Sequence, residues 1–386
     1  MSKYVIENGR IYTEIGTIKK GYLIIENEKI VQIASGAYEG DLTTIDVNGQ
    51  HVLPGFIDIH MHGGYGEDAM DASLEGLKHL SESLLSEGTT SYLATTMTQS
   101  DDNITKALEN IVNYQQNQDT YHAASIVGIH LEGPFISEHK VGAQNPAYVQ
   151  RPSVAKIEQF QKIAKNQIKV ITFAPEVEGA QETLKALHSD MRFSIGHTVA
   201  TYDEVNEAVK HGARHVTHLY NAGTAFGHRE PGVFGAAWLN DKLSTELIVD
   251  GIHSHPAAIE VAYKLKGNQR FLLITDAMRA KGMPDGDYDL GGQNVTVKGS
   301  EARLASGALA GSILKMNEGL RNLMTFTGDS LDQLWRVASL NQAITLNIDD
   351  TKGSLKVGKD ADIVIANDDI DVLATIKAGE IHKFNL

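Results

Sequence analysis

The 386-residue sequence contains no cysteine, which excludes disulfide bonds, thiol nucleophiles and thiolate-held metal clusters. It also lacks an excess of basic residues, because 34 Lys and Arg stand against 49 Asp and Glu and give a formal net charge of −15. A protein that follows nucleic-acid phosphates needs a basic face, so we do not expect a nucleic-acid partner. No apolar run approaches the roughly 18 residues that cross a bilayer, and the first residues contain no apolar signal segment. We therefore expect a cytoplasmic protein without a membrane partner.

The composition is that of a folded globular protein. Hydrophobic residues make up 42% of the chain and charged residues 22%, a balance that excludes intrinsic disorder. The length predicts two domains, or one large domain with a smaller appendage. The chain has 16 histidines and no thiols, so any metal site must be built from imidazole and carboxylate groups.

Both ends of the chain have the alternating pattern of β-strands. In the first fifty residues, short alternating runs are separated by Asn-Gly, Lys-Gly and Ser-Gly turns, and the last forty residues have the same texture. Chain termini often lie close together in a folded domain, so the two ends can pair. We predict a small β-sandwich domain formed by residues 1–52 and 345–386.

The middle of the chain alternates short β-branched runs with helical patterns, which is typical of βα units and a parallel sheet. Eight such runs lie at 52–59, 89–96, 125–131, 169–174, 192–195, 215–217, 244–249 and 271–275. Eight units favour a (β/α)₈ TIM-like barrel over residues 53–344. An open doubly wound sheet would need a glycine-rich phosphate loop after the first strand, which residues 54–58 do not provide. Residues 283–309 predict a hairpin-bearing insertion after the eighth strand, and helices are expected at 312–326 and 331–341.

Metal-capable side chains follow five of these predicted strands: His60 and His62, Glu132, His197, His218 and Asp276. Taken singly, each histidine is better interpreted as a hydrogen-bonded core residue, and a lone glutamate as a helix cap or ion-pair partner. In a barrel, however, the carboxyl ends of the strands meet at one rim, where active sites are built. Their shared position therefore predicts a single site. Its nitrogen and oxygen ligands suit Zn²⁺, Fe²⁺, Mn²⁺ or Co²⁺.

Several short motifs carry a family resemblance. They are Gly-Phe-Ile-Asp-Ile-His-Met-His-Gly-Gly at 55–64, Leu-Glu-Gly-Pro-Phe at 131–135, Gly-His-Thr at 196–198, Thr-His-Leu-Tyr-Asn-Ala at 217–222, Arg-Glu-Pro-Gly at 229–232, Asp-Gly-Ile-His at 250–253 and Thr-Asp-Ala at 275–277. With them the chain resembles the amidohydrolase superfamily and, within it, the N-acetylglucosamine-6-phosphate deacetylases. The His-x-His pair marks only the superfamily, whereas the Leu-Glu-Gly-Pro, His-Leu-Tyr-Asn-Ala and Arg-Glu-Pro-Gly stretches are specific to the deacetylases. The resemblance covers nearly the whole chain.

The resemblance implies a metal-dependent hydrolase that converts N-acetyl-D-glucosamine 6-phosphate to D-glucosamine 6-phosphate and acetate in amino-sugar metabolism. Glu132, His197 and His218 match the family's main metal ligands. Asp276 matches the acid/base, which also lies against the metal and would move a proton from water to the departing amine. The pair His60 and His62 matches residues that support a second metal in some members, so one or two divalent ions per subunit are expected.

Further positions match the family's substrate-binding residues: Ala143, Gln144, Asn221, Ala222, Arg229, His253, Leu309, Ala310 and Gly311. Some members have histidine at the position of Gln144, and a role that depends on that histidine is not expected in this chain. Arg229 would bind the phosphate with its forked guanidinium, with His228 as a weaker candidate beside it, although an ordinary ion pair with Glu230 is the simpler interpretation outside the motif. Members are commonly homodimers in which a neighbouring subunit helps at the phosphate, so a homodimer is expected.

Two other functions remain open at this point. A cyclic amidase of the dihydroorotase or hydantoinase type usually carries a bridging carboxylated lysine at the end of the fourth strand, and residues 170–176 contain none. A non-catalytic sugar-phosphate sensor would have lost metal ligands or the acid/base, and every matched ligand position is retained here. Both alternatives are therefore weaker than the deacetylase.

Overall fold

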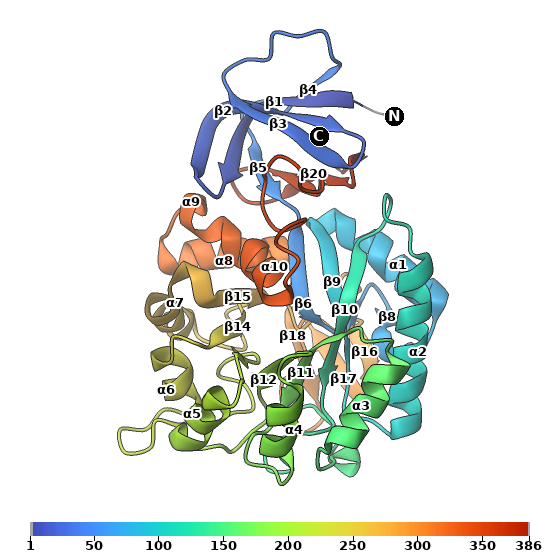
Figure 1. Cartoon of the computed structure of the whole chain (residues 1–386), viewed down its shortest axis with the longest axis vertical. Helices are drawn as coiled ribbons and strands as arrows, with labels where there is room; N and C mark the ends of the chain where they lie inside the picture. The colour runs from blue at the N-terminus through green and yellow to red at the C-terminus, as the bar shows by residue number, and fades with distance from the viewer. Residues whose placement is uncertain (1–2, 385–386) are drawn as a thin grey trace.

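The computed structural model describes residues 3–384. A small β domain lies at one end of a larger α/β barrel, and both ends of the chain lie at the small domain (Figure 1). Its strands join in one sheet of order β21-β20-β19-β5-β1-β2-β3, with β4 paired to β1. Their bounds are β1 Lys3–Thr13, β2 Gly16–Glu26, β3 Lys29–Ser35, β4 Thr44–Asp46, β5 His51–Pro54, β19 Ile363–Ala366, β20 Val372–Lys377 and β21 Glu380–Lys383. The two chain ends meet where β5 pairs antiparallel with β19.

A second sheet of eight parallel strands forms the barrel, in the order β15-β14-β13-β12-β11-β10-β9-β6. The strands are β6 Phe56–Met61, β9 Thr89–Thr96, β10 Ser125–Glu132, β11 Ile168–Phe173, β12 Arg192–Ile195, β13 His215–Val216, β14 Ser244–Ile248 and β15 Phe271–Ile274. The first and last strands meet through main-chain bonds just beyond their ends. Asp276 N donates to His60 O at 2.8 Å, and His62 N donates to Ala277 O at 2.9 Å. The predicted fold class is confirmed, and the domain boundaries remain a prediction.

Helices surround the barrel strands, as Figure 1 shows. Their bounds are α1 Leu74–Leu84, α2 Asp101–Asn117, α3 Val154–Ile163, α4 Ala180–Leu187, α5 Tyr202–Lys210, α6 Gly232–Leu239, α7 Pro256–Arg270, α8 Met316–Thr327, α9 Leu331–Leu334 and α10 Leu340–Leu346, with 3₁₀ turns η1 Ala69–Asp71, η2 Leu85–Glu87, η3 Pro146–Tyr148 and η4 Trp335–Ala338. Side chains cap several of them; Thr201 and Glu204, for example, form a capping box at the start of α5. Within residues 3–384, no helix combines the length and apolarity needed to span a membrane.

The prediction of one strand over 52–59 is wrong, because the chain changes sheets at Gly55. Residues before it form β5 in the small sheet, and residues after it form β6 in the barrel. Gly55 N donates to Asp362 O at 2.9 Å. A Cβ at this position would lie 2.2 Å from Thr90 Oγ1, so only glycine lets the chain pass there without a shift of its neighbours. The apolar run is continuous because strands on both sides of the break are buried.

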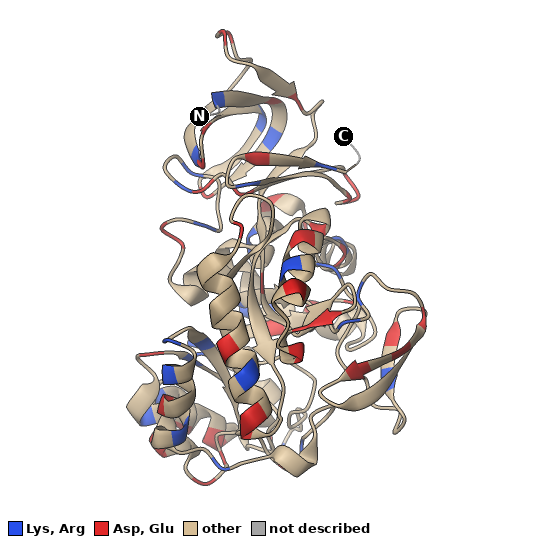
Figure 2. Cartoon of the chain, turned by 90° about the vertical axis from the view of Figure 1, so that its right-hand side faces the viewer, with Lys and Arg blue, Asp and Glu red and all other residues tan. Residues whose placement is uncertain are grey.

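The predicted hairpin insertion is present and has a third strand. β16 Gly286–Leu290, β17 Gln293–Lys298 and β18 Glu301–Leu304 form an antiparallel sheet that projects from the side of the barrel (Figure 2). Its buried residues form a cluster with Met97, Met278 and Ala310. A short two-stranded sheet, β7 Gly63–Gly64 with β8 Glu67–Asp68, follows the first barrel strand. The insertion brings residues 303–309 to the rim where the barrel strands end.

Candidate active site

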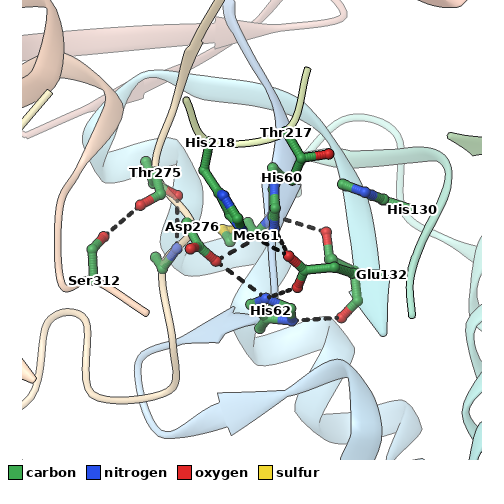
Figure 3. Close-up of polar contacts among 12 residues, drawn as sticks. His60, Met61, His62, His130, Glu132, Thr217, His218, Thr275, Asp276 and Ser312 are labelled. Carbon is green, nitrogen blue, oxygen red and sulfur yellow. Dashed lines mark hydrogen bonds and ion pairs between the residues drawn. The ribbon is translucent and has the colours of Figure 1, made fainter. Parts of the chain in front are cut away.

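The structure gathers all six predicted metal-capable residues at the carboxyl ends of the barrel strands. Each of them is less than 9% exposed. Figure 3 shows five of them, with Glu132 and Asp276 facing the imidazoles. The complete set is His60, His62, Glu132, His197, His218 and Asp276.

Glu132, the last residue of β10, lies at the centre of this group. Its Oε1 lies 3.1 Å from His218 Nε2 and 3.2 Å from His197 Nε2. The two Nε2 atoms are themselves 3.1 Å apart. Two ring nitrogens and one carboxylate oxygen therefore converge on one point, which is the donor set of a divalent metal site.

The other oxygen of Glu132 belongs to a second group of donors. Glu132 Oε2 lies 3.0 Å from His62 Nε2, and Asp276 Oδ1 lies 3.1 Å from the same nitrogen. His60 Nε2 lies 3.4 Å from both Glu132 Oε1 and Asp276 Oδ1. This nitrogen is buried and has no hydrogen-bond partner among residues 3–384. A buried ring nitrogen without a partner is costly unless a ligand contacts it, so these residues too fit a metal ion.

The outer nitrogens of two of the histidine rings are held by main-chain oxygens. His197 Nδ1 donates to Lys140 O at 3.0 Å, and His62 Nδ1 donates to Thr95 O at 3.3 Å. When such a ring is neutral, the hydrogen on Nδ1 leaves the lone pair on Nε2, the nitrogen that faces the centre. These contacts hold both rings in the orientation that a metal ligand needs.

Burial disfavours charge at this centre, but the pairing of imidazoles with carboxylates outweighs it. Asp276 and Glu132 raise the pKa of His62 to about 10 despite its burial. Burial alone would raise the pKa of Glu132, yet the charge on His60 and hydrogen bonds from His197 and His218 hold it well below its usual value. Without a metal, protons on the rings balance the carboxylates. A cation that binds here must displace such protons.

Three of these residues have a strained main-chain conformation. His197, His218 and Asp276 have φ values of 49°, 26° and 48°, in the left-handed region that few non-glycine residues adopt. Each follows the end of its strand by two residues. Such strain clusters at functional sites, where the surrounding structure holds it in place. Here it accompanies the turn of each side chain from the strand end toward Glu132.

A cavity of about 310 Å³ opens over the centre. Seven of the nine predicted substrate-binding residues line it, namely Ala143, Gln144, Asn221, Ala222, His253, Leu309 and Gly311. The structure does not bring the other two into the lining. Ala310 is buried in the core of the insertion, and Arg229 is exposed, with its Nη1 2.9 Å from Nε2 of the neighbouring His228.

Two cavity contacts go beyond what the sequence predicted. Gln144 Nε2 donates to Glu132 Oε2 at 2.9 Å, so this amide holds the central carboxylate. Arg303 of β18 lines the cavity, with Nε 2.7 Å from Glu301 Oε2 and Nη1 2.7 Å from Gly307 O. Nothing in the local sequence distinguishes Arg303 from a surface arginine. Only the docking of the insertion places it at the site.

Two buried carboxylates beneath the centre were also missed. Glu246 on β14 accepts from His60 Nδ1 at 2.9 Å. Asp58 on β6 accepts from Thr275 Oγ1 and from His60 N at 3.2 Å, and it links the first strand to the last. Burial raises the pKa of Asp58 to about 6. A sequence signal existed for both, because each is an acidic residue inside a predicted barrel strand that should be buried on both faces.

Residues 51–382 match the model of the amidohydrolase family. An N-acetylglucosamine-6-phosphate deacetylase of Bacillus subtilis (strain 168) is 46% identical over 381 residues, covering 98% of this chain and 96% of the relative. An N-acetylgalactosamine-6-phosphate deacetylase of Escherichia coli O157:H7 is 34% identical over 382 residues, covering 99% and 100%. The crystal structure of N-acetylglucosamine-6-phosphate deacetylase from Pasteurella multocida superposes with a TM-score of 0.93 at 29% identity, covering 99% and 100%. The chain belongs to the amidohydrolase family.

Proposed function

We propose that this protein is a hydrolase that deacetylates N-acetyl-D-glucosamine 6-phosphate, giving D-glucosamine 6-phosphate and acetate. One observation carries the proposal: the Glu132-centred donor group lies beside Asp276 at a cavity, in a chain 46% identical to an enzyme of that name. The reaction belongs to amino-sugar metabolism. A phosphorylated sugar is charged and crosses membranes poorly, so a cytoplasmic location fits the proposed substrate.

Metal would be held by His197, His218 and Glu132, with a second position offered by His60, His62, Glu132 and Asp276. A divalent ion there supplies Lewis acidity, which lowers the pKa of water and polarises an amide carbonyl. Zn²⁺, Fe²⁺, Mn²⁺ and Co²⁺ all accept these ligands, one or two per chain. Elemental analysis of protein purified without added metal identifies the ion and its number.

Asp276 is proposed as the general base and acid. Asp276 is 8% exposed and lines the cavity, with Oδ1 near His60 and His62. The charge on His60 and the hydrogen bond from His62 hold its pKa at about 2, although burial alone would raise it. Its carboxylate is therefore ionised at neutral pH, and it can take a proton from water and return it to the leaving amine.

His253 is proposed to contact the oxygen that becomes negative during attack. His253 lines the cavity, and its Nδ1 donates to Asp250 Oδ2 at 2.6 Å. The hydrogen bond from His253 holds the pKa of Asp250 below its usual value, although burial opposes the shift. An ionised Asp250 accepts from Nδ1 and so fixes the ring, which leaves Nε2 to face substrate.

Arg303 is proposed as the residue of the same chain that contacts the phosphate. The protein is acidic overall, so an anionic substrate needs a local cation. Arg303 provides a guanidinium at the cavity, whereas Arg229 is exposed outside the lining. We propose that Arg229 instead contacts the phosphate in the cavity of a second copy, within the homodimer that the family resemblance implies.

The cyclic amidase alternative finds no support at the fourth strand. β11 ends at Phe173 and is followed by Ala174 and Pro175, so no lysine stands there to be carboxylated. Glu132 from β10 occupies the centre of the donor group instead. The relative from Escherichia coli acts, by its name, on N-acetylgalactosamine 6-phosphate, so that epimer is the substrate to compare.

The function is tested by measuring acetate release with metal-loaded protein on both sugar phosphates, on unphosphorylated N-acetylglucosamine and on a cyclic amide. We expect the highest kcat/KM on N-acetylglucosamine 6-phosphate. Asp276→Asn should lower kcat by about 10²- to 10⁴-fold, the usual contribution of a general acid–base group. Asp241→Asn, at an exposed aspartate, is the matched control and should not change kcat. Full turnover by Asp276→Asn would contradict the mechanism, and cyclic amide opening without acetate release would contradict the function.

A further inference from the structure

Glu246 is a fully buried carboxylate that contacts one predicted metal ligand and lies against the main chain of another. It sits on β14 with 0% exposure. Its Oε2 accepts from His60 Nδ1 at 2.9 Å and from the main-chain N–H of His218 at 3.4 Å. These partners come from β6 and from the turn after β13, so one carboxylate oxygen bridges both groups of donors.

The contact determines which nitrogen of His60 carries the hydrogen. A carboxylate without a proton only accepts, so Nδ1 must be the donor and the lone pair of the neutral ring lies on Nε2. His60 Nε2 is the buried nitrogen without a hydrogen-bond partner among the described residues. It lies 3.4 Å from both Glu132 Oε1 and Asp276 Oδ1. In the neutral form of the ring, which is the form that binds a metal, Glu246 therefore directs the lone pair of His60 toward the second donor group.

A purely structural role explains Glu246 poorly. Its Oε1 is buried without a hydrogen-bond partner among residues 3–384, and the ring nitrogen His215 Nδ1, 4.0 Å from it, also has no partner there. No lysine or arginine pairs with Glu246 in the described part of the chain. A buried carboxylate held in this way costs stability, since its desolvation is only partly offset. Its presence is better explained by what it does to His60.

We propose that Glu246 is a positioning residue of the metal centre, which acts through His60 Nδ1 and sets the affinity of the donor group formed by His60, His62, Glu132 and Asp276. It touches neither substrate nor metal. The inference rests on the proposed function only in taking this group as a metal site. Carboxylates that accept from the outer nitrogen of a ligating histidine fix its tautomer and raise its basicity, and their loss typically costs 10- to 100-fold in metal affinity.

The test is Glu246→Gln, which keeps the shape of the side chain but removes its charge. Binding of Zn²⁺ and of Mn²⁺ to metal-free protein is measured by calorimetry and by elemental analysis after dialysis, with no substrate present. We expect the affinity of one site to fall by 10- to 100-fold while the melting temperature of the metal-free protein is unchanged or higher. Because these readouts need no turnover, they remain interpretable if the proposed reaction is wrong.

Glu87→Gln is the matched control, because Glu87 is also fully buried but contacts no predicted metal ligand. It should lower the melting temperature and leave metal affinity unchanged, the reverse of Glu246→Gln. In a His60→Asn background, Glu246→Gln should have little further effect on metal affinity, since the proposed action passes through His60. If Glu246→Gln does not fold, Glu246→Asp replaces it under the same criteria. Metal affinity equal to that of the wild type, or an equal loss in the His60→Asn background, would overturn the proposal.

Discussion

The buried ion pair of Lys281 with Glu87 tests how much a buried charge pair contributes to the stability of the fold. Lys281 Nζ lies 2.8 Å from Glu87 Oε1, and both side chains are 0% exposed. Removing one partner of such a pair costs about 3–5 kcal/mol, because the other charge stays buried without compensation. Two hydroxyls still donate to Glu87 after Lys281→Met, those of Tyr65 at 3.1 Å and Thr89 at 3.3 Å. We therefore expect the lower end of the range, about 3 kcal/mol.

Urea unfolding of metal-free protein measures this loss. With a slope of about 3 kcal/mol per molar urea, the Lys281→Met midpoint should fall by about 1 M. The double variant Lys281→Met with Glu87→Gln should lose less than Lys281→Met alone, since no unpaired charge remains buried. Lys106→Met is the control, because Lys106 pairs with Asp102 at 2.7 Å on an exposed helix face; exposed pairs contribute at most about 1 kcal/mol. Equal midpoints for Lys281→Met and Lys106→Met would refute the reasoning.

Three further predictions concern metal, phosphate and acid. Binding of Zn²⁺ should release protons, because the pKa of His62 without metal is about 10. Calorimetry in buffers of different ionisation enthalpy counts the released protons. A Zn²⁺ affinity that does not change between pH 6 and 8 would contradict this prediction. Arg303→Met should lower kcat/KM on the phosphorylated sugar about tenfold or more and leave kcat/KM on the unphosphorylated sugar unchanged. If Arg229 acts across a dimer, mixing Arg229→Met protein with Asp276→Asn protein should restore activity that each variant lacks alone. Burial opposes charge on Asp362, but Lys377 and Lys352 hold its pKa below the usual value. The ionised carboxylate therefore stabilises the fold above about pH 4, and this contribution is lost as the pH falls further. The difference in unfolding free energy between wild type and Asp362→Asn should therefore shrink from pH 5 to pH 2, and a constant difference would count against this account.

Much of the fold follows from local pattern, and the errors have physical causes. The runs at 89–96 and 192–195 coincide with β9 and β12, because β-branched and aromatic side chains favour strands. Buried residues on both sides hid the break at Gly55, where two strands of different sheets follow one another. Alternation in the insertion revealed a hairpin but not the third strand, β18, which is only four residues long.

The predicted donors meet because a barrel brings the ends of all its strands to one rim. That rule needs only the position of each residue after its strand, which the sequence reveals for His60, Glu132 and Asp276. Residues that act through another side chain have no such rule. Glu246 can be recognised as an acidic residue in a predicted barrel strand, but its partner, His60, lies 186 positions away in the chain.

The sequence by itself determined the class of chemistry. It holds no thiols, it places imidazoles and carboxylates after barrel strands, and its motifs resemble those of one family. Only the tertiary structure decided how these groups share the site, with Glu132 between two donor groups, Arg303 at the cavity and Arg229 outside it. The reason is physical: strand ends are local properties of the chain, whereas the docking of the insertion and the distances between ring nitrogens and carboxylates depend on packing between segments far apart in sequence.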